Sequence, residues 1–268
     1  MELRINSMLK FHHTRTEHPA ELHFEMHAHS AYELFYLVEG RGTFWVEGSE
    51  YSLHAGDMMM FNISEVHHID VDPTEPYERI VVNFRGELFD DVPDGAALLE
   101  PFCGHISGHG NRLRPEDFPD TYWQRCLLRL AQESEQQGLQ TYSNLLPICN
   151  EIRLAYAKIR PAVLPQDTLP RQIIAYINDN LHTLHGVEQI TEQFHVSRSA
   201  LYALFRRVTG SSVWEYITVK RLMEAKRLLN DGELPTAVYL QCGFRDYTTF
   251  FRAYKRQFGI SPGKDCIK

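Results

Sequence analysis

The most regular pattern of hydrophobic and polar positions in the chain covers residues 212–230. When this stretch is drawn as a helix at about 100° per residue, its apolar side chains fall on about half of the circumference. Glu215, Lys220, Lys226 and Arg227 lie outside that arc. The pattern predicts an amphipathic helix of about five turns. Its apolar positions are Val213, Trp214, Ile217, Leu222, Ala225, Leu228 and Leu229.

The same local pattern stands on each side of this predicted helix: a short helix, a tight turn, a Ser or Asp cap and a second helix. On the N-terminal side, Ser197 caps a helix that Gly210 terminates. On the C-terminal side, Asp246 caps the helix that follows a turn at residues 242–244. We therefore expect two helix-turn-helix units joined by a connector of roughly 27 Å, a little less than the ~34 Å between successive major-groove faces of B-DNA.

The outer faces of both second helices carry polar and cationic side chains, which can contact base edges and phosphates. One such unit would also suit any three-helix bundle, but a second unit favours a DNA reader. The candidate DNA-contacting residues are Arg198, Ser199, Tyr202 and Arg206 in the first unit, and Tyr247, Thr248, Phe251, Arg252 and Lys255 in the second. Arg221 projects from the apolar arc of the connector, so we expect it to satisfy a buried carboxylate or carbonyl.

Short alternating runs between residues 20 and 85 predict a second kind of structure. The runs are rich in aromatic and β-branched residues and are separated by turn residues at intervals of about ten, which is typical of antiparallel strands in a small barrel or sandwich. They cover residues 21–29, 32–40, 42–48, 50–56, 57–63 and 77–84. The His12-His13 pair and the charged residues after it precede the first of these runs, where they could form an arm or lid.

Four residues of these runs form a candidate site. Side chains two positions apart on a strand face the same way, so His27 and His29 project together into the barrel, and Glu33 begins the adjoining strand. With His67, which follows a Gly56-Asp57 pair, the pattern resembles the two motifs of the cupin barrels over about 60 residues. In metal-binding cupins the matching residues hold one divalent ion; here His68 competes for the last place.

The chemistry of this candidate site stays open between two interpretations. Three imidazoles and a carboxylate suit Zn, Fe, Mn, Ni or Cu. The alternative is a polar interior whose histidines only hydrogen-bond to one another or to a small-molecule hydroxyl. Tyr36 and Trp45, with Phe35, are candidates to line the same barrel, because aromatic faces stack on sugar rings.

Two helical stripes follow in the middle of the chain. One contains Trp123, Leu127 and Leu130, and the other runs through Leu145, Ile148, Ile152, Ala155 and Ile159 at alternating spacings of three and four. So narrow a stripe needs a partner, which could be the barrel, the first helix or the same helix of a second subunit. We favour a homodimer, because paired DNA readers gain affinity from linkage. The proline-rich stretch at 161–170 predicts a semi-stiff tether and the domain boundary.

Composition narrows the functional classes. The 268 residues are 43% hydrophobic and 23% charged, as in ordinary globular proteins, and no apolar run is long enough for a membrane span or a secretory leader. We therefore expect a cytoplasmic protein without a membrane partner. Five scattered cysteines argue against a disulfide framework or a cysteine zinc site. Residues from Pro170 onward carry a net charge of +5 and the preceding part −13, which suits a nucleic-acid partner for the C-terminal part only.

The C-terminal pattern strongly resembles the AraC/XylS family of bacterial transcription regulators over roughly the last 85 residues. The matching positions are Ser197, Leu201, Phe205, Gly210, Tyr216, Ile217, Arg221, Leu222, Ala225, Leu228, Leu229, Gly243, Phe244, Asp246, Phe250, Arg252, Tyr254, Lys255, Phe258, Gly259, Ser261 and Pro262. A cupin-like sensor joined by helices to such a tail is a familiar arrangement in that family.

The resemblance places base-reading residues at Ser199, Tyr202 and Ala203 in the first unit and at Tyr247, Thr248 and Arg252 in the second. Three departures stand out. Ala203 has no polar group, Phe251 replaces a small residue, and Tyr239 stands where close packing expects a small aliphatic side chain, so it should push its helix outward or turn its hydroxyl to solvent.

We therefore predict an α+β chain with three parts: a cupin-like antiparallel β-barrel over residues 1–110, a helical hairpin for dimerisation over 111–161, and an all-α double helix-turn-helix domain over 162–268. The predicted function is ligand-responsive transcription regulation. Its partners are double-stranded DNA, a sugar or other small polar effector bound at the barrel residues, a second subunit and RNA polymerase. The alternative is a metal-dependent cupin enzyme, an isomerase or dioxygenase, with a DNA-binding tail.

Overall fold

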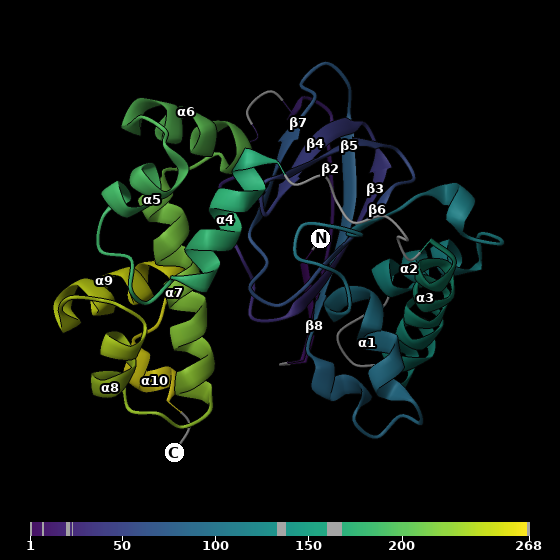
Figure 1. Ribbon diagram of the computed structural model, residues 1–268. Helices are drawn as coiled ribbons and strands as arrows, with labels where there is room; N and C mark the ends of the chain where they lie inside the picture. Colours follow the sequence, from purple (N-terminus) through teal and green to yellow (C-terminus); the bar gives the residue numbers. More distant parts are fainter. Residues whose placement is uncertain are drawn as a thin grey trace.

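The structure, a computed structural model, describes residues 2–6, 8–19, 22, 24–132, 138–159 and 168–266. Strands come first in the chain and helices follow, so the class is α+β, as predicted (Figure 1). The strands are β1 (Glu2–Asn6), β2 (Leu9–Thr16), β3 (Tyr32–Glu39), β4 (Arg41–Val46), β5 (Ser49–His54), β6 (Met58–Phe61), β7 (His67–Val71), β8 (Tyr77–Phe84) and β9 (Arg112–Leu113).

The strands form two antiparallel sheets. One has six strands in the order β1-β2-β8-β3-β6-β9, and the other has three in the order β5-β4-β7. Their facing sides enclose a buried aromatic cluster that includes Phe35, Phe44 and Phe61. No ladder joins the two sheets among the described strands, so the predicted barrel is an open, sandwich-like arrangement rather than a closed one.

Five of the predicted runs are confirmed as β3, β4, β5, β6 and β8. Two predictions at the N-terminal side are wrong. His12 and His13 are no arm or lid, because they lie in β2, where they pair with β8 at Val81 and Ile80. Residues 24–29 form no strand, and only His27 pairs, in an isolated bridge to His67.

Three helices cover the other face of the six-stranded sheet: α1 (Gly95–Cys103), α2 (Tyr122–Gln132) and α3 (Gly138–Ile159). Both predicted stripes are buried here, against the sheet and against each other. Sheet residues such as Leu34, Met60 and Val82 meet Trp123 and Ile148 in this core. The partner of the narrow stripe is therefore the chain itself. Of the tether predicted at 161–170, residues 161–167 lie outside the described residues, whereas Leu169 and Pro170 are not tether but begin α4.

The C-terminal helices build two separate hydrophobic cores. The first contains residues of α4 (Leu169–Asp179), α5 (Val187–Phe194) and α6 (Arg198–Thr209); the second contains residues of α8 (Pro235–Gln241) and α9 (Tyr247–Phe258), with the short α10 (Pro262–Asp265) beside it. The predicted connector is α7 (Val213–Asn230), which contributes to both cores. We call α4–α6 with the start of α7 the first head, and α8–α10 with the end of α7 the second head.

Local capping explains where these helices begin. The Ser197 hydroxyl accepts a hydrogen bond from the Ala200 amide at 3.1 Å, and the Asp246 carboxylate accepts one from the Thr249 amide at 2.8 Å. Ser212 and Glu215 form a reciprocal capping box at the start of α7. Gly210 ends α6 with a φ of 67°. Among the described residues, no helix combines the length and apolar character needed to cross a membrane.

Candidate functional site

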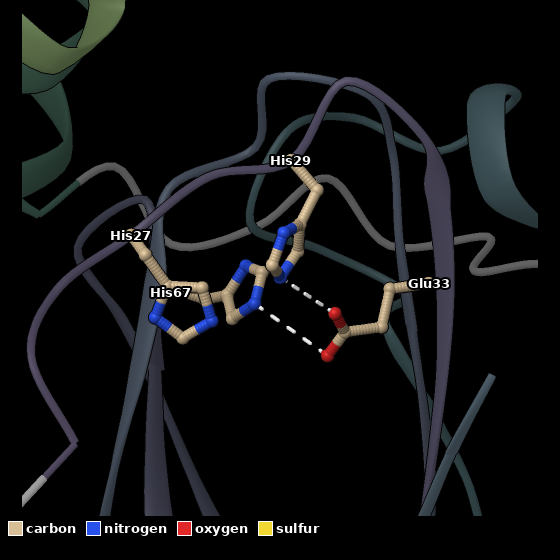
Figure 2. A group of neighbouring side chains, drawn as sticks. All are labelled: His27, His29, Glu33 and His67. Carbon is tan, nitrogen blue, oxygen red and sulfur yellow. Dashed lines mark ion pairs between the residues drawn. The ribbon is translucent and has the colours of Figure 1, made fainter. Parts of the chain in front are cut away.

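The four residues predicted to form a site do come together at one end of the sandwich (Figure 2). Their ligand atoms all lie within 4.8 Å of one another. Glu33 lies in β3, His67 begins β7, and His27 is held against His67 by the isolated bridge. His29 Nε2 lies 2.7 Å from one oxygen of Glu33, and His67 Nε2 lies 3.7 Å from the other. We call these four residues the histidine cluster.

Two histidines of the cluster are locked in the same tautomer. His27 Nδ1 lies 2.7 Å from the Glu25 carbonyl, and His67 Nδ1 lies 2.9 Å from the Glu65 carbonyl. Because a carbonyl only accepts, each Nδ1 carries a proton, which leaves each Nε2 as the ring atom that can bind a ligand. His67 Nε2 is buried and has no hydrogen-bond partner. This orientation is the one that metal-ligating histidines take, so the residues present fit a divalent ion.

The surroundings shift the pKa values of the cluster residues in different directions. Burial lowers the pKa of His27 to about 3, and the neighbouring His67 and His29 act in the same direction. Burial also acts to lower the pKa of His29, but the Glu33 carboxylate outweighs it and the pKa is raised. Burial acts to raise the pKa of Glu33, yet His29 and His67 hold it well below the usual range. Near neutral pH the cluster thus offers the Glu33 carboxylate and the neutral imidazole of His27, both of which can accept hydrogen bonds from hydroxyl groups.

Two further residues contact the cluster from the interior of the sandwich. Asn83, which pairs with Glu33 across β3 and β8, donates a hydrogen bond to the Glu33 carboxylate at 2.7 Å. The Phe61 ring stacks on His67 with the ring centroids 3.9 Å apart. The sequence analysis did not single out either residue. Strand register is the signal that could have identified both residues, because Asn83 of β8 and Phe61 of β6 pair with Glu33 from the two sides of β3.

Tyr36, Trp45 and His68 were predicted at this site but lie elsewhere, because neighbouring positions on a strand face opposite sides of the sheet. Tyr36 points into the helical layer, where the centroids of its ring and the Trp123 ring lie 5.0 Å apart. Trp45 lies on the outer face of β4, where its ring is stacked on the His68 ring with the centroids 6.4 Å apart. His67, not His68, therefore joins the cluster, and the prediction that Tyr36 and Trp45 line the cavity is wrong.

The second group of candidate residues lies on α6 and α9. Arg198, Ser199, Tyr202, Ala203 and Arg206 are all exposed on α6. On α9, the exposed residues are Tyr247, Thr248, Arg252 and Lys255, whereas Phe251 is half-buried against the Tyr247 ring. The two helices thus offer hydrogen-bonding, cationic and aromatic groups to a partner outside the chain.

Contacts between the two heads fix their relative orientation. As predicted, Arg221 satisfies buried carbonyls: its Nε donates to Leu181 O at 2.8 Å and its Nη2 to Leu184 O at 2.6 Å, both in the first head. Gly243 of the second head packs beside the Arg221 guanidinium. Arg245 Nη2, which the sequence analysis missed, donates to His185 O at 3.0 Å. The heads are therefore joined by side chains as well as by α7.

Tyr239 lies on α8 and contacts aromatic residues of α9. It is half-buried, and its ring lies 5.7 Å from Tyr247 and 6.5 Å from Phe250. The large side chain thus supports α9 from behind, next to a residue on the exposed face of that helix.

Comparison with known proteins agrees with both halves of the chain. A family model described as an AraC-like ligand binding domain matches residues 14–145, and one described as a helix-turn-helix domain matches residues 190–265. The chain belongs to the AraC family of transcription regulators.

Relatives in this family align over most of their length. The chain is 25% identical over 240 residues to the Msm operon regulatory protein of Streptococcus mutans, covering 87% of this chain and 83% of that one. It is 26% identical over 244 residues to the Arabinose operon regulatory protein of Escherichia coli, covering 87% and 79%. Among solved structures, ToxT of Vibrio cholerae aligns at 12% identity over 97% of each chain with a TM-score of 0.42.

Membership of the AraC family decides between the two functions that the sequence allowed. The relatives are transcription regulators, so the protein is a regulator with a ligand-binding domain and a DNA-binding domain and not a cupin enzyme. AraC-family regulators bind DNA and small-molecule effectors.

Proposed function

We propose that this AraC-family protein binds a specific two-part DNA site with both heads at once and changes that binding when a small polar effector enters the cavity of the histidine cluster. The observation that carries the proposal is the pair of exposed helices α6 and α9 on heads that α7 and Arg221 hold together. Two rigidly joined readers favour a site with fixed spacing between its halves.

Within the proposed DNA interface, the residues divide by chemistry. Base edges would be read by Ser199, Tyr202, Ala203, Tyr247, Thr248 and Arg252, with Ala203 offering only methyl packing. Arg198, Arg206 and Lys255 would contact phosphates, and Phe251 would contact a thymine methyl group. Selection from random duplexes with the purified full chain tests this assignment. A two-part consensus supports it, whereas recovery of no consensus would overturn it.

We expect Tyr202→Ala and Arg252→Ala each to cost about 1–3 kcal/mol of binding free energy at particular base pairs of the selected site. The loss should vanish when those base pairs are changed, because a base reader discriminates only at the position it touches. Arg207→Ala is the matched control, since Arg207 is also exposed on α6 but lies outside the proposed interface. Equal losses on every sequence would mean that these side chains contact only the DNA backbone.

The proposed effector is a sugar or a similar small polar metabolite. The neutral imidazole of His27 and the Glu33 carboxylate accept hydrogen bonds from hydroxyl groups, and the Phe61 and Phe44 rings lie beside His67. Two relatives are named as regulators of the arabinose and raffinose operons. Calorimetry against a panel of sugars measures this binding. We also propose a cytoplasmic location, because the proposed partner is DNA.

One observation favours a divalent ion in the same cavity: the buried, unpartnered Nε2 of His67, which faces three other ligand groups. His27, His29, Glu33 and His67 would hold the ion, which would supply a Lewis-acid centre for effector oxygens. We expect about one metal per chain in elemental analysis of protein purified without a His tag. His27→Ala should abolish it, whereas the control His54→Ala, on an exposed position of β5, should retain it. No metal in the parent protein would leave hydrogen bonding as the chemistry of the cluster.

We further propose that the protein is a homodimer joined through the outer face of the hairpin, and that the bound complex contacts RNA polymerase. The buried stripes are used within the chain, but Leu128, Leu139 and Leu154 are exposed on α2 and α3, with exposed fractions of 47%, 85% and 39%. An apolar face of this kind suits a second copy of the helix. The domain boundaries proposed for this arrangement are residues 1–110, 111–161 and 162–268, and a native mass spectrum gives the subunit count.

A further inference from the structure

The sensor sandwich and the first head share a buried interface one strand-layer away from the histidine cluster. Backbone hydrogen bonds of 3.1 and 3.0 Å join His27 and His67 in both directions. These two residues face the cavity, whereas the positions next to them in sequence face the opposite way. Ala28 and Val66 belong to the same hydrophobic core as residues of α4, α6 and α7. Each of the two segments therefore touches the effector site with one side and the first head with the other.

His68 extends this contact to the end of a recognition helix. The His68 ring packs against Gly210, where a Cβ atom would lie only 3.1 Å from Nε2. Trp45 lies beside His68 and also packs against the core of the first head. The outer face of β4 and β7 is therefore a docking surface, which explains why its aromatic residues are absent from the cavity.

A buried carboxylate anchors the docked domains. Glu47 stands at the tip of the hairpin between β4 and β5, in a left-handed backbone conformation with a φ of 46°. Its carboxylate accepts hydrogen bonds from the Val66 amide at 2.8 Å, from Lys220 Nζ at 3.0 Å and from the Tyr216 hydroxyl. Lys220 also donates to Ser64 O at 3.0 Å. Both cross-domain partners, Tyr216 and Lys220, lie on α7.

The chemistry of this contact makes it reversible. The Glu47 side chain is only 1% exposed and that of Lys220 15%, so the ion pair is largely shielded from water while the domains are docked. Burial, with Glu47 beside it, raises the pKa of Tyr216 well above its usual range, so its hydroxyl remains a donor. The cost of removing both charges from water offsets much of their attraction, so the ion pair adds little net stability to the docked state. Polar pairs of this kind specify a geometry without making it permanent.

We propose that Glu47, Tyr216 and Lys220 form a latch that closes the sensor onto the first head, and that occupancy of the histidine cluster sets how firmly this latch closes. The segment at residues 64–68 is the physical link: Ser64 and Val66 bond directly to the latch, and His67 faces the effector. An effector can shift the docking equilibrium only through such a differential contact. The coupling rests on the proposed function, whereas the latch itself can be tested without DNA or effector.

The latch sets orientation rather than hiding the DNA-binding surface. The candidate DNA-contacting residues of α6 remain exposed while the sensor is docked. The second head shares no hydrophobic core with the sensor among the described residues and follows the first through α7 and Arg221. In a dimer joined through the outer face of the hairpin, a closed latch would therefore fix the distance between the two DNA-binding domains.

Hydrogen–deuterium exchange of the full chain tests the latch. Lys220→Met leaves the Glu47 carboxylate buried without its cation, so amides of Glu47, Val66 and α4 should exchange about 10- to 100-fold faster than in the parent. Lys226→Met is a closely matched control: Lys226 is also on α7 and also 15% exposed, but it pairs with Asp265 inside the second head at 3.2 Å. Its effect should remain within the second head. Equal exchange of the α4 and Val66 amides in the two variants would overturn the latch.

The link to the cavity is tested by a substitution on its other side. His67→Gln loosens the shared segment, so the α4 and α7 amides at the interface should exchange at least several-fold faster. Phe35→Leu alters the same sandwich interior from β3, which takes no part in the interface, and should leave those amides within twofold of the parent. Acceleration by both variants, or by neither, would overturn the coupling. Because these measurements need no DNA, their failure and a failure to select a DNA site are distinguishable.

Discussion

Replacing Gly243 by alanine is expected to lower the free energy of unfolding by about 3 kcal/mol and to abolish binding to the selected DNA site. Gly243 has a φ of 77°, and a Cβ atom there would lie 2.7 Å from His182 O and 3.0 Å from the Arg221 guanidinium. The first of these atoms is backbone of the first head, so it cannot rotate away. The substitution would therefore push the two heads apart at the point where they meet.

Gly259 provides a control for the backbone strain alone. Its φ is 73°, but no atom lies within 4 Å of the position that a Cβ would take. Gly259→Ala should consequently cost only about 1 kcal/mol, the price of a left-handed alanine. Urea unfolding of both full-length variants, followed by circular dichroism, measures the difference. If the two variants were equally stable, close contact between the heads at Gly243 would be refuted.

Replacing Arg221 by methionine is expected to cost about 3 kcal/mol of unfolding free energy. The change keeps most of the side-chain volume but leaves Leu181 O and Leu184 O without their buried donor. Burial lowers the pKa of Arg221, yet a guanidinium remains charged at any working pH. Molecules of the variant that still fold should bind the DNA site more weakly, because the guanidinium also supports Gly243 of the second head.

Arg227→Met is the control for Arg221→Met. Arg227 lies on the same helix and pairs with Glu224 and Asp231, but its side chain is 60% exposed. Surface ion pairs of this kind contribute at most about 1 kcal/mol. The thermal midpoints of the two variants, measured side by side, should therefore differ by several degrees. A larger loss for Arg227→Met would show that the charge of α7, rather than the buried donor, stabilises the domain.

The helices of the two helix-turn-helix units and the connector could be predicted from the sequence, because their signals are local, whereas α4 was not predicted. Caps at Ser197 and Asp246, the left-handed Gly210 and the apolar arc of α7 each determine structure within a few residues. The buried role of Arg221 followed from its place on that arc. Arg245 could not be found in this way, since its partner, His185 O, lies 60 residues away and nothing in the local pattern marks it.

The histidine cluster could also be predicted, because spacing along strands brings His27, His29 and Glu33 to one face. The prediction failed for Tyr36 and Trp45, because it relied on their aromatic character and not on the alternation of side chains along the strand. Each of them stands one position away from an inward-facing residue, Phe35 or Phe44. In this fold both faces of the sandwich are covered, one by the helical hairpin and the other by the first head. An aromatic residue in one of these strands therefore does not show which face of the strand points into the sandwich.

The docking surface around Glu47 was beyond the reach of sequence patterns. A glutamate followed by glycine at a hairpin tip indicates a solvated turn, and only the packing of α7 against that turn buries it. The connector was predicted from its amphipathic arc, with Lys220 among the residues outside it. The same lysine becomes buried because a second domain covers this side of the helix.

The central claim is that α7 and Arg221 hold the two heads at one spacing, so that both read the same side of a duplex. Insertion of base pairs between the two halves of the selected site tests it directly, with binding of the full chain measured at constant salt. The account predicts that five added base pairs, about half a helical turn, abolish specific binding, and that ten do not restore it because the connector cannot lengthen. Undiminished affinity after the insertion of five base pairs would show that the heads move independently, and would contradict the account.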